Sequence, residues 1–333
     1  MKPGRRAKTL SCLLVMPLLF GLALPALAAN TVKTKTTEAA PANADAPAAE
    51  SLPPRDPAYA AFEDGRYLTA LELAKTAAAA GEPTAHTLIA RLYAEGLGVQ
   101  RDLKVAADWY RKAADLGDIN AKFALGLMFA KGDGVTKDSA AAAQLFEQAA
   151  KAGSIRAKYN LGLLYAVGDG RQQDAVKAAA LITEAAKGGE PQARFDLGQM
   201  YANGAGVQAD EILAAHWTEL AAASGLSDAQ VEFAVMLFKG RGTLIDKSRA
   251  AWYFTAAAEH GNPIAQNRLA NLYAYGVVYT KDVVTAAKWH LLARKAGVSD
   301  FRLDLLLGTL KPEQRAQADA DATQWLERVN PTP

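Results

Sequence analysis

The sequence predicts an all-α solenoid of antiparallel helix pairs, because one pattern of residues recurs six times at a fixed period. An alanine is found every 36 residues without insertion, at Ala85, Ala121, Ala157, Ala193, Ala229 and Ala265. Eleven positions after each alanine comes a glycine, seventeen after it an aspartate, and thirty-two after it another glycine. Repeats of this length are typical of solenoids, in which each unit buries its apolar face against its neighbours.

Each copy predicts two helices. In the second copy Ala121, Leu125, Met128 and Phe129 fall on one side of a 3.6-residue helix. A glycine pair, such as Gly132 and Gly134, lets the chain leave this helix in a left-handed conformation. The aspartate then caps a second helix. That helix has small alanines and, at one position, a larger residue, which in the six copies is Trp109, Leu145, Leu181, Trp217, Tyr253 and Trp289.

Residues 131–138, KGDGVTKD, have the glycines and acids of a phosphate- or calcium-binding loop. However, the acid between the glycines is not repeated, since Asp133 corresponds to Leu97, Asp169, Ala205, Arg241 and Val277 in the other copies. We therefore expect a turn, in which Asp138 caps the second helix of its repeat.

The N-terminal end predicts export. Residues 1–28 have four basic residues, then an apolar run and a small-residue ending at Ala28, which indicates a cleaved signal peptide. An uncleaved membrane anchor is the alternative. Residues 29–56 are rich in Ala, Pro and Thr and predict a disordered linker.

The composition of the mature chain excludes two classes of function. The whole chain has a formal charge of +2, but the part after residue 28 has 33 basic and 35 acidic residues. The mature chain therefore lacks the excess of basic residues that would indicate nucleic-acid binding. The only cysteine is Cys12, within the predicted signal peptide, so thiol catalysis and cysteine–zinc sites are excluded.

The repeated residues resemble the Sel1-like repeat family, which is related to the tetratricopeptide repeat (TPR). The second copy, AKFALGLMFAKGDGVTKDSAAAAQLFEQAAKAGS, carries the resemblance best, whereas Arg171, Leu237 and Val278 depart from the pattern. The resemblance implies a right-handed superhelix with the first helices on its concave side. It also implies a protein partner, such as envelope-assembly machinery, an exopolysaccharide system or the ectodomain of a membrane-bound sensor.

The predicted domains follow from these boundaries. Residues 57–84 contain the TPR-like Gly65-Arg66-Tyr67 and predict a capping helix pair, and residues 301–330 predict C-terminal capping helices. The six repeats between them span residues 85–120, 121–156, 157–192, 193–228, 229–264 and 265–300.

A candidate binding face lies on the first helices, at the third, sixth and tenth positions after the starting alanine. These positions point away from the predicted core side and vary between copies, with an apolar centre and a polar rim that suit a peptide or a protein helix. The alternative is that the apolar residues contact a neighbouring helix. The candidate residues are Arg91, Glu95, Leu127, Lys131, Asn160, Leu163, Val167, Asp196, Gln199, Asn203, Glu232, Lys239, Arg268, Asn271 and Tyr275, and Leu88, Ala124 and Val235 occupy the other three positions.

No catalytic, cofactor or metal site is predicted. The motifs G-x-S-x-G, S-x-x-K and H-E-x-x-H are absent from the sequence. The four histidines, His86, His216, His260 and His290, fall at different repeat positions, and we expect each to be a partly exposed helix residue. Trp109, Trp217 and Trp289 share one repeat position, which favours core packing over sugar binding, whereas Trp252 and Trp325 are less constrained.

The sequence as a whole predicts a non-catalytic scaffold in the periplasm of a Gram-negative bacterium, which binds a protein or peptide without a cofactor. Two alternatives remain open. One is a cell-wall or polysaccharide-associated protein that binds glycan or, less in keeping with the sequence, hydrolyses it. The other is a secreted host-interaction factor.

Overall fold

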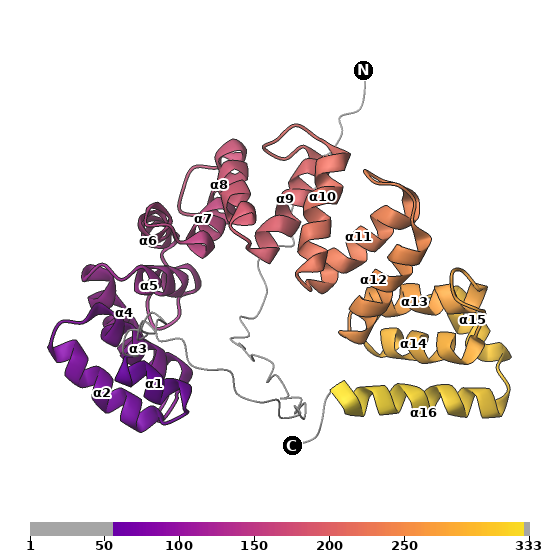
Figure 1. Ribbon diagram of the computed structural model, residues 1–333, viewed down its shortest axis with the longest axis horizontal. Coiled ribbons are helices and arrows are strands. Elements are labelled where there is room, and N and C mark those ends of the chain that lie inside the picture. Colours follow the sequence, from indigo (N-terminus) through magenta and orange to yellow (C-terminus); the bar gives the residue numbers. More distant parts are fainter. Residues whose placement is uncertain (1–55, 330–333) are drawn as a thin grey trace, which may run out of the picture. The chain divides into compact units, whose positions relative to one another are not determined.

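The structure is a computed structural model that describes residues 56–329. Within these residues, which all belong to one compact unit, the chain forms sixteen helices and no strand (Figure 1). The predicted signal peptide, its cleavage site near Ala28 and residues 29–55 of the predicted linker lie outside the described residues. Asp56, the last residue of that linker, is the N-cap of the first helix.

The helices alternate between two kinds. The first helices of the pairs are α1 (Pro57–Glu63), α3 (Pro83–Glu95), α5 (Ile119–Lys131), α7 (Ile155–Val167), α9 (Pro191–Asn203), α11 (Ser227–Lys239) and α13 (Pro263–Tyr275). The second helices are α2 (Tyr67–Ala79), α4 (Leu103–Asp115), α6 (Ser139–Lys151), α8 (Ala175–Lys187), α10 (Glu211–Ala223), α12 (Lys247–Glu259) and α14 (Val283–Lys295). Two further helices, α15 (Phe301–Thr309) and α16 (Pro312–Val329), end the described chain.

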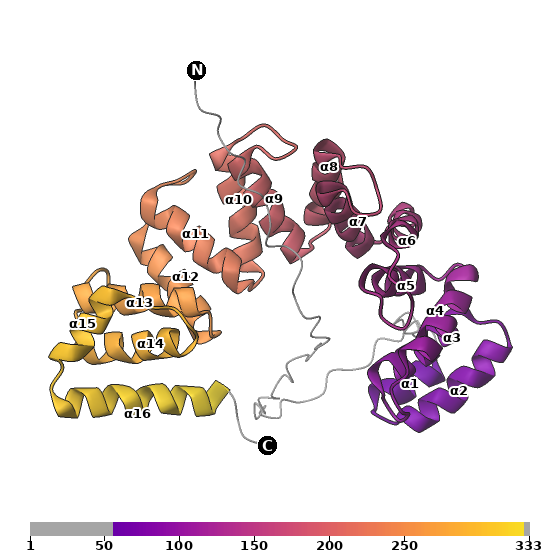
Figure 2. The ribbon, with the colours of Figure 1, turned by 180° about the vertical axis from the view of Figure 1, so that it is seen from behind.

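Each helix packs against the helix before it and the helix after it, from α1 to α14. Figure 2 shows the same succession of pairs from behind. This consecutive packing confirms the predicted all-α solenoid of helix pairs. The first helices α3 to α13 begin two residues before their starting alanines. In α5, α7 and α13 the residue just before the helix, Asp118, Ser154 or Asn262, caps it through its side chain.

The alanines that recur in the sequence form the contacts between helices. All six starting alanines of the first helices are buried, and so are two alanine columns of the second helices, at Ala106, Ala142, Ala178, Ala214, Ala250 and Ala286, and at Ala113, Ala149, Ala185, Ala221, Ala257 and Ala293. Alanine loses no side-chain conformational entropy in a helix and lets two backbones approach closely. Small residues therefore form the closest contacts between the helices, and larger ones such as Phe146 and Leu197 fill the space between them.

The turn inside each repeat has the conformation that the glycines predict. Gly132 ends α5 with a φ of 83°, and Gly134 follows with a φ of 70°. The Asp138 carboxylate then accepts hydrogen bonds from the backbone N–H groups of Ala140 (3.0 Å) and Ala141 (2.9 Å). KGDGVTKD is thus a turn followed by a helix cap, as expected.

The C-terminal helix α16 covers the last repeat by packing along α14 (Figure 1). Its buried side is formed by Ala318, Ala322 and Trp325. The Trp325 ring meets that of Trp289 edge to face, with centroids 6.0 Å apart, and its indole Nε1–H donates to Glu259 over 2.9 Å. A solenoid exposes apolar surface at its last unit unless that unit is covered, and α16 supplies this cover.

Candidate protein-interaction face

The candidate face consists of the fifteen residues predicted above on the first helices α3 to α13. Each of the fifteen side chains is at least partly exposed, which keeps the face available to a partner. Leu88, which shares the pattern, is 0% exposed. It packs in the cluster that α1 and α2 form with α3, because the N-terminal helix pair covers the first repeat. Leu88 is therefore a core residue and was wrongly grouped with the face.

Several polar residues of the candidate face bond within the chain. Arg91 donates to Glu95 over 2.7 Å, one turn further along α3, and its guanidinium also lies 4.6 Å from the centre of the Phe62 ring. Glu232 accepts from Arg241, which lies in the turn after α11. These side chains already have polar partners within the chain.

Asp196, an acid of the candidate face, is partly buried. The Tyr159 hydroxyl, from the preceding repeat, donates to its carboxylate over 2.8 Å, and Gln192 Nε2 donates over 3.1 Å. Burial raises the pKa of Asp196 above its ordinary value, and the two hydrogen bonds only partly offset this effect. Burial, followed by the nearby charge of Asp196, raises the pKa of Tyr159 as well.

The apolar residues at the centre of the candidate face differ in whether they contact a neighbouring helix or are open to a partner. Leu127 and Leu163 are half-buried, as the neighbour-contact alternative expects. Leu127 packs against a core cluster of the second and third repeats, and Leu163 against one of the third and fourth repeats. Val167, at the end of α7, is 48% exposed. The open apolar surface at the centre therefore belongs mainly to Val167.

The tenth position, at the end of each first helix, is the most open part of the candidate face. Lys131, Val167, Asn203, Lys239 and Tyr275 occupy it in five copies, and all five are exposed. Asn203 Nδ2 donates back to the Gln199 carbonyl over 2.8 Å. Asn160 makes the same kind of bond to Arg156, so neither amide is tied to another helix.

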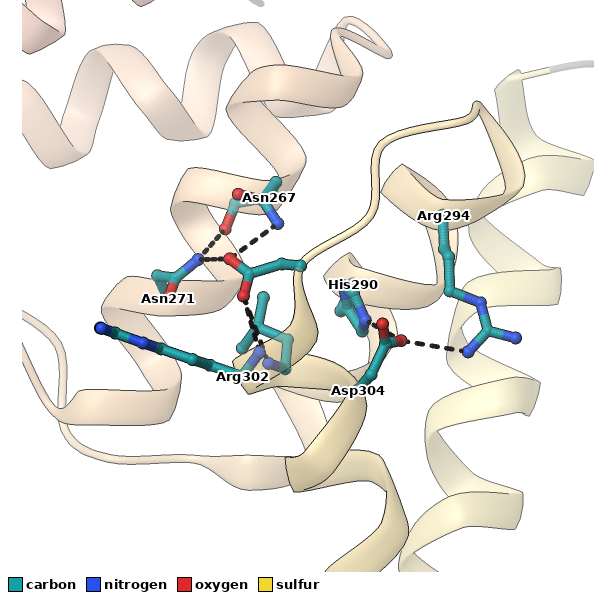
Figure 3. A network of polar contacts seen from close by, with 8 residues as sticks. Asn267, Asn271, His290, Arg294, Arg302 and Asp304 are labelled. Atoms are coloured by element: carbon teal, nitrogen blue, oxygen red, sulfur yellow. Dashed lines mark hydrogen bonds and ion pairs between the residues drawn. The ribbon is translucent and has the colours of Figure 1, made fainter.

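Asn271 belongs to a polar network that joins the last repeat to α15 (Figure 3). Its Nδ2 donates to the Asp300 carboxylate (3.1 Å) and to the Asn267 carbonyl (2.9 Å). Asp300 also caps α15 by accepting from the backbone N–H of Arg302 over 3.1 Å. Burial raises the pKa of Asp300, but hydrogen bonds from Asn271 and Asn267 outweigh it and leave the pKa below the ordinary value. Asn271 thus links α13 to the residue that caps α15.

The same network contains a histidine that the sequence reasoning misjudged. His290 is 0% exposed, where partial exposure was expected, and its Nε2 lies 2.9 Å from Asp304 Oδ1, which Arg294 also contacts (Figure 3). Its other nitrogen, Nδ1, is buried and has no hydrogen-bond partner among residues 56–329. His86 is buried too, whereas His216 and His260 are exposed as expected. His290 occupies the position that Tyr110, Phe146, Ile182, Thr218 and Phe254 occupy in the other copies, and this shared core position was the missed signal.

The described part of the chain gives little support for other kinds of functional site. Between residues 56 and 329 no group of three His, Cys, Asp or Glu side chains is arranged to hold a metal ion. In the same range no helix has the length and apolar character to cross a membrane. Two hollows of about 560 and 600 Å³ lie near Tyr279 and near Trp325, and neither is lined by a residue of the candidate face.

Comparison with known proteins agrees with this architecture. The Sel1 repeat model matches residues 83–118, 119–154, 155–190, 191–226, 227–262 and 263–298. A solved Sel1 repeat protein from Oxalobacter formigenes is 33% identical, with a TM-score of 0.67 over 72% of this chain and 98% of that one. Comparison with curated proteins gives no significant match.

A second solved structure, a protective antigen present in uropathogenic Escherichia coli strains, displays an SLR fold. It is 29% identical, with a TM-score of 0.70 over 81% of this chain. This chain spans 62% of the antigen's length. Because the family model matches six consecutive segments and the Oxalobacter protein is similar over nearly its whole length, this chain belongs to the Sel1 repeat family.

Proposed function

We propose that this protein is an exported, non-catalytic scaffold that binds a protein or peptide on the candidate face of its first helices. Sel1 repeat proteins are generally protein-interaction scaffolds, which supports the class of function. The observation that carries the proposal for this chain is the row of exposed residues at the ends of successive first helices. A solenoid presents such a row as one extended surface, which a single partner can contact at several repeats.

The proposed place of action is the periplasm, with partners among envelope-assembly, exopolysaccharide or sensor proteins. The predicted signal peptide supports export. Cell fractionation followed by N-terminal sequencing tests this step. A mature chain that begins near residue 29 in the periplasmic fraction is expected, and an intact N-terminus in the cytoplasm would contradict it.

Site-specific photo-crosslinking in the native host tests the binding face. A photoreactive phenylalanine analogue replaces Tyr275 or Val167, which are exposed on first helices. Matched control positions are Trp252 on α12 and Val176 on α8, which are exposed on second helices. We expect one crosslinked protein from the first two positions and none from the controls. Crosslinks from the controls alone would move the binding surface to the second helices.

Glycan binding is the second candidate, and Trp252 favours it. This indole is 61% exposed on α12, and an open aromatic face can stack on a sugar ring. Sedimentation with purified peptidoglycan separates the two candidates. Co-sedimentation that the Trp252→Ala variant loses would favour glycan binding, whereas no co-sedimentation leaves the protein-binding proposal preferred.

A further inference from the structure

The charged residues of the candidate face divide into bonded and open groups. Its three acids, Glu95, Asp196 and Glu232, all accept hydrogen bonds from side chains of the same chain. Arg91 is held by one of these acids. Glu95 and Glu232 are paired with arginines, whereas the donors to Asp196 are neutral, so each acid of the face already has a hydrogen-bond partner within the chain.

The other three charged residues are cations without such bonds. Lys131, Lys239 and Arg268 are exposed, and within residues 56–329 none of the three forms an ion pair or a side-chain hydrogen bond. Asp133 lies two residues after Lys131 and is exposed as well, but the two side chains do not pair. The charge that the candidate face offers to a partner is therefore positive, although the chain after residue 28 is slightly acidic.

Apolar and aromatic surface lies among these cations. Arg268 and Tyr275 are seven residues apart on α13, which places them two turns apart on one side of the helix. Tyr275 is 56% exposed, and its ring is open to contact. Val167 supplies the exposed apolar side chain at the end of α7. A partner that satisfies the whole row needs carboxylates together with apolar side chains.

We propose that the partner presents an acidic peptide segment, with interspersed apolar or aromatic residues, along this row of helix ends and onto Arg268, two turns before the end of α13. The inference rests on the proposed function and adds the chemistry of the partner to it. Carboxylates bind Lys131, Lys239 and Arg268, and apolar residues contact Val167 and Tyr275. Charge complementarity of this kind fixes which partner binds and in which register.

The length of the segment follows from the spacing of the repeats. The hydrogen bond from Tyr159 to Asp196 links the first helices of two neighbouring repeats through their side chains. Helices in direct contact lie about 8–10 Å apart, so the four steps from Lys131 to Arg268 cover at least about 30–40 Å. An extended chain gains about 3.3 Å per residue, and about 12 residues are therefore needed.

A displayed library of random 15-residue peptides tests the inference, with the full-length mature chain as bait. We expect the enriched peptides to have a net negative charge and at least one aromatic or large apolar residue. The Lys131→Gln, Lys239→Gln, Arg268→Gln triple variant should lower their recovery about tenfold, and added salt should weaken binding of the original chain.

The matched control is the Lys187→Gln, Lys295→Gln, Lys104→Gln triple variant. Lys187 and Lys295 end α8 and α14 as Lys131 and Lys239 end α5 and α11, and Lys104 is an exposed residue of α4. This variant loses the same charge and should keep the enriched peptides. Circular dichroism confirms that both variants are folded.

Two results would overturn the inference. Enrichment of neutral or basic peptides would show that charge does not select the partner, and so would equal recovery by both triple variants. Both results are independent of the crosslinking experiment at Val167 and Tyr275. Crosslinking can therefore support the proposed function even if the peptide library shows that the partner is not acidic. A library without any enriched peptide would also count against a linear acidic segment.

Discussion

The backbone of Gly134 lies against Leu103, the first residue of the second helix in the preceding repeat. A Cβ added at position 134 would stand 2.2 Å from the Leu103 carbonyl oxygen, and equivalent close contacts join Gly170 to Ser139 and Gly242 to Glu211. In these turns the second glycine therefore serves two purposes. It allows the left-handed backbone, and it lets one repeat sit directly on the next.

This contact predicts that Gly134→Ala destabilises the protein by more than backbone strain alone. Gly117 provides the control, because its φ of 97° is also left-handed but nothing lies within 4 Å of an added Cβ. Gly117→Ala should cost about 1 kcal/mol of unfolding free energy. Gly134→Ala should cost about 2–4 kcal/mol, since the repeats must also move apart. Urea unfolding measures both, and equal losses would show that the close approach is not needed.

Val278 replaces this glycine in the sixth repeat and keeps the left-handed conformation, with a φ of 68°. A β-branched residue is strained there by about 1–2 kcal/mol. Val278→Gly should therefore raise the unfolding free energy by about 0.5–1 kcal/mol, after the entropy that glycine gains in the unfolded chain is subtracted. Val278→Ala keeps the strained backbone, so its gain in unfolding free energy should be smaller than that of Val278→Gly. A Val278→Gly variant less stable than the original would mean that the valine side chain contributes more than its backbone costs.

Asp196 predicts a dependence of stability on pH. Its raised pKa means that the folded chain holds the proton more tightly than the unfolded chain. Its contribution to stability is therefore greatest at a pH below the ordinary aspartate pKa of about 4, and it falls as the pH rises through the folded pKa. Asp196→Asn should raise the melting temperature at pH 7 and give no gain near pH 3.5.

Asp300 is the matched control for this experiment, because its pKa is lowered in the folded chain. Its stabilising effect is present above the ordinary pKa and lost as the pH falls. Asp300→Asn should consequently lower the melting temperature at pH 7, opposite in sign to Asp196→Asn. A loss at pH 7 from Asp196→Asn would mean that the carboxylate, when ionised, stabilises the contact with Tyr159.

Most of the fold could be predicted from residues that recur at the same position of each repeat, because such a residue meets the same neighbours in every copy. Exceptions arise where the neighbours differ. Leu88 is buried by the N-terminal helix pair, which has no counterpart beside the other repeats. Asn271 is engaged by Asp300, which ends the sixth repeat and caps α15, a helix with no counterpart after the other repeats. Asp196 depends on Tyr159 from the preceding repeat, and that pair of residue types occurs only once in the six copies.

Trp325 and Trp252, the two tryptophans outside the shared repeat position, should contribute very differently to stability. Trp325 is 6% exposed, contacts Trp289 and donates to Glu259, so Trp325→Ala removes a large buried ring from the contact between α16 and α14. We expect a loss of about 3–5 kcal/mol in the stability of this end of the chain. Trp252→Ala leaves an exposed site and should stay within about 0.5 kcal/mol of the original.

Hydrogen exchange can localise this loss. If α16 acts as the cover of the last repeat, Trp325→Ala should speed the exchange of amides in α13, α14 and α16 and leave those in α5 and α7 unchanged, because each repeat contacts only its neighbours. Equal acceleration along the whole chain would show instead that the repeats unfold as one unit. No change in α14 would mean that the solenoid is stable without its C-terminal helix.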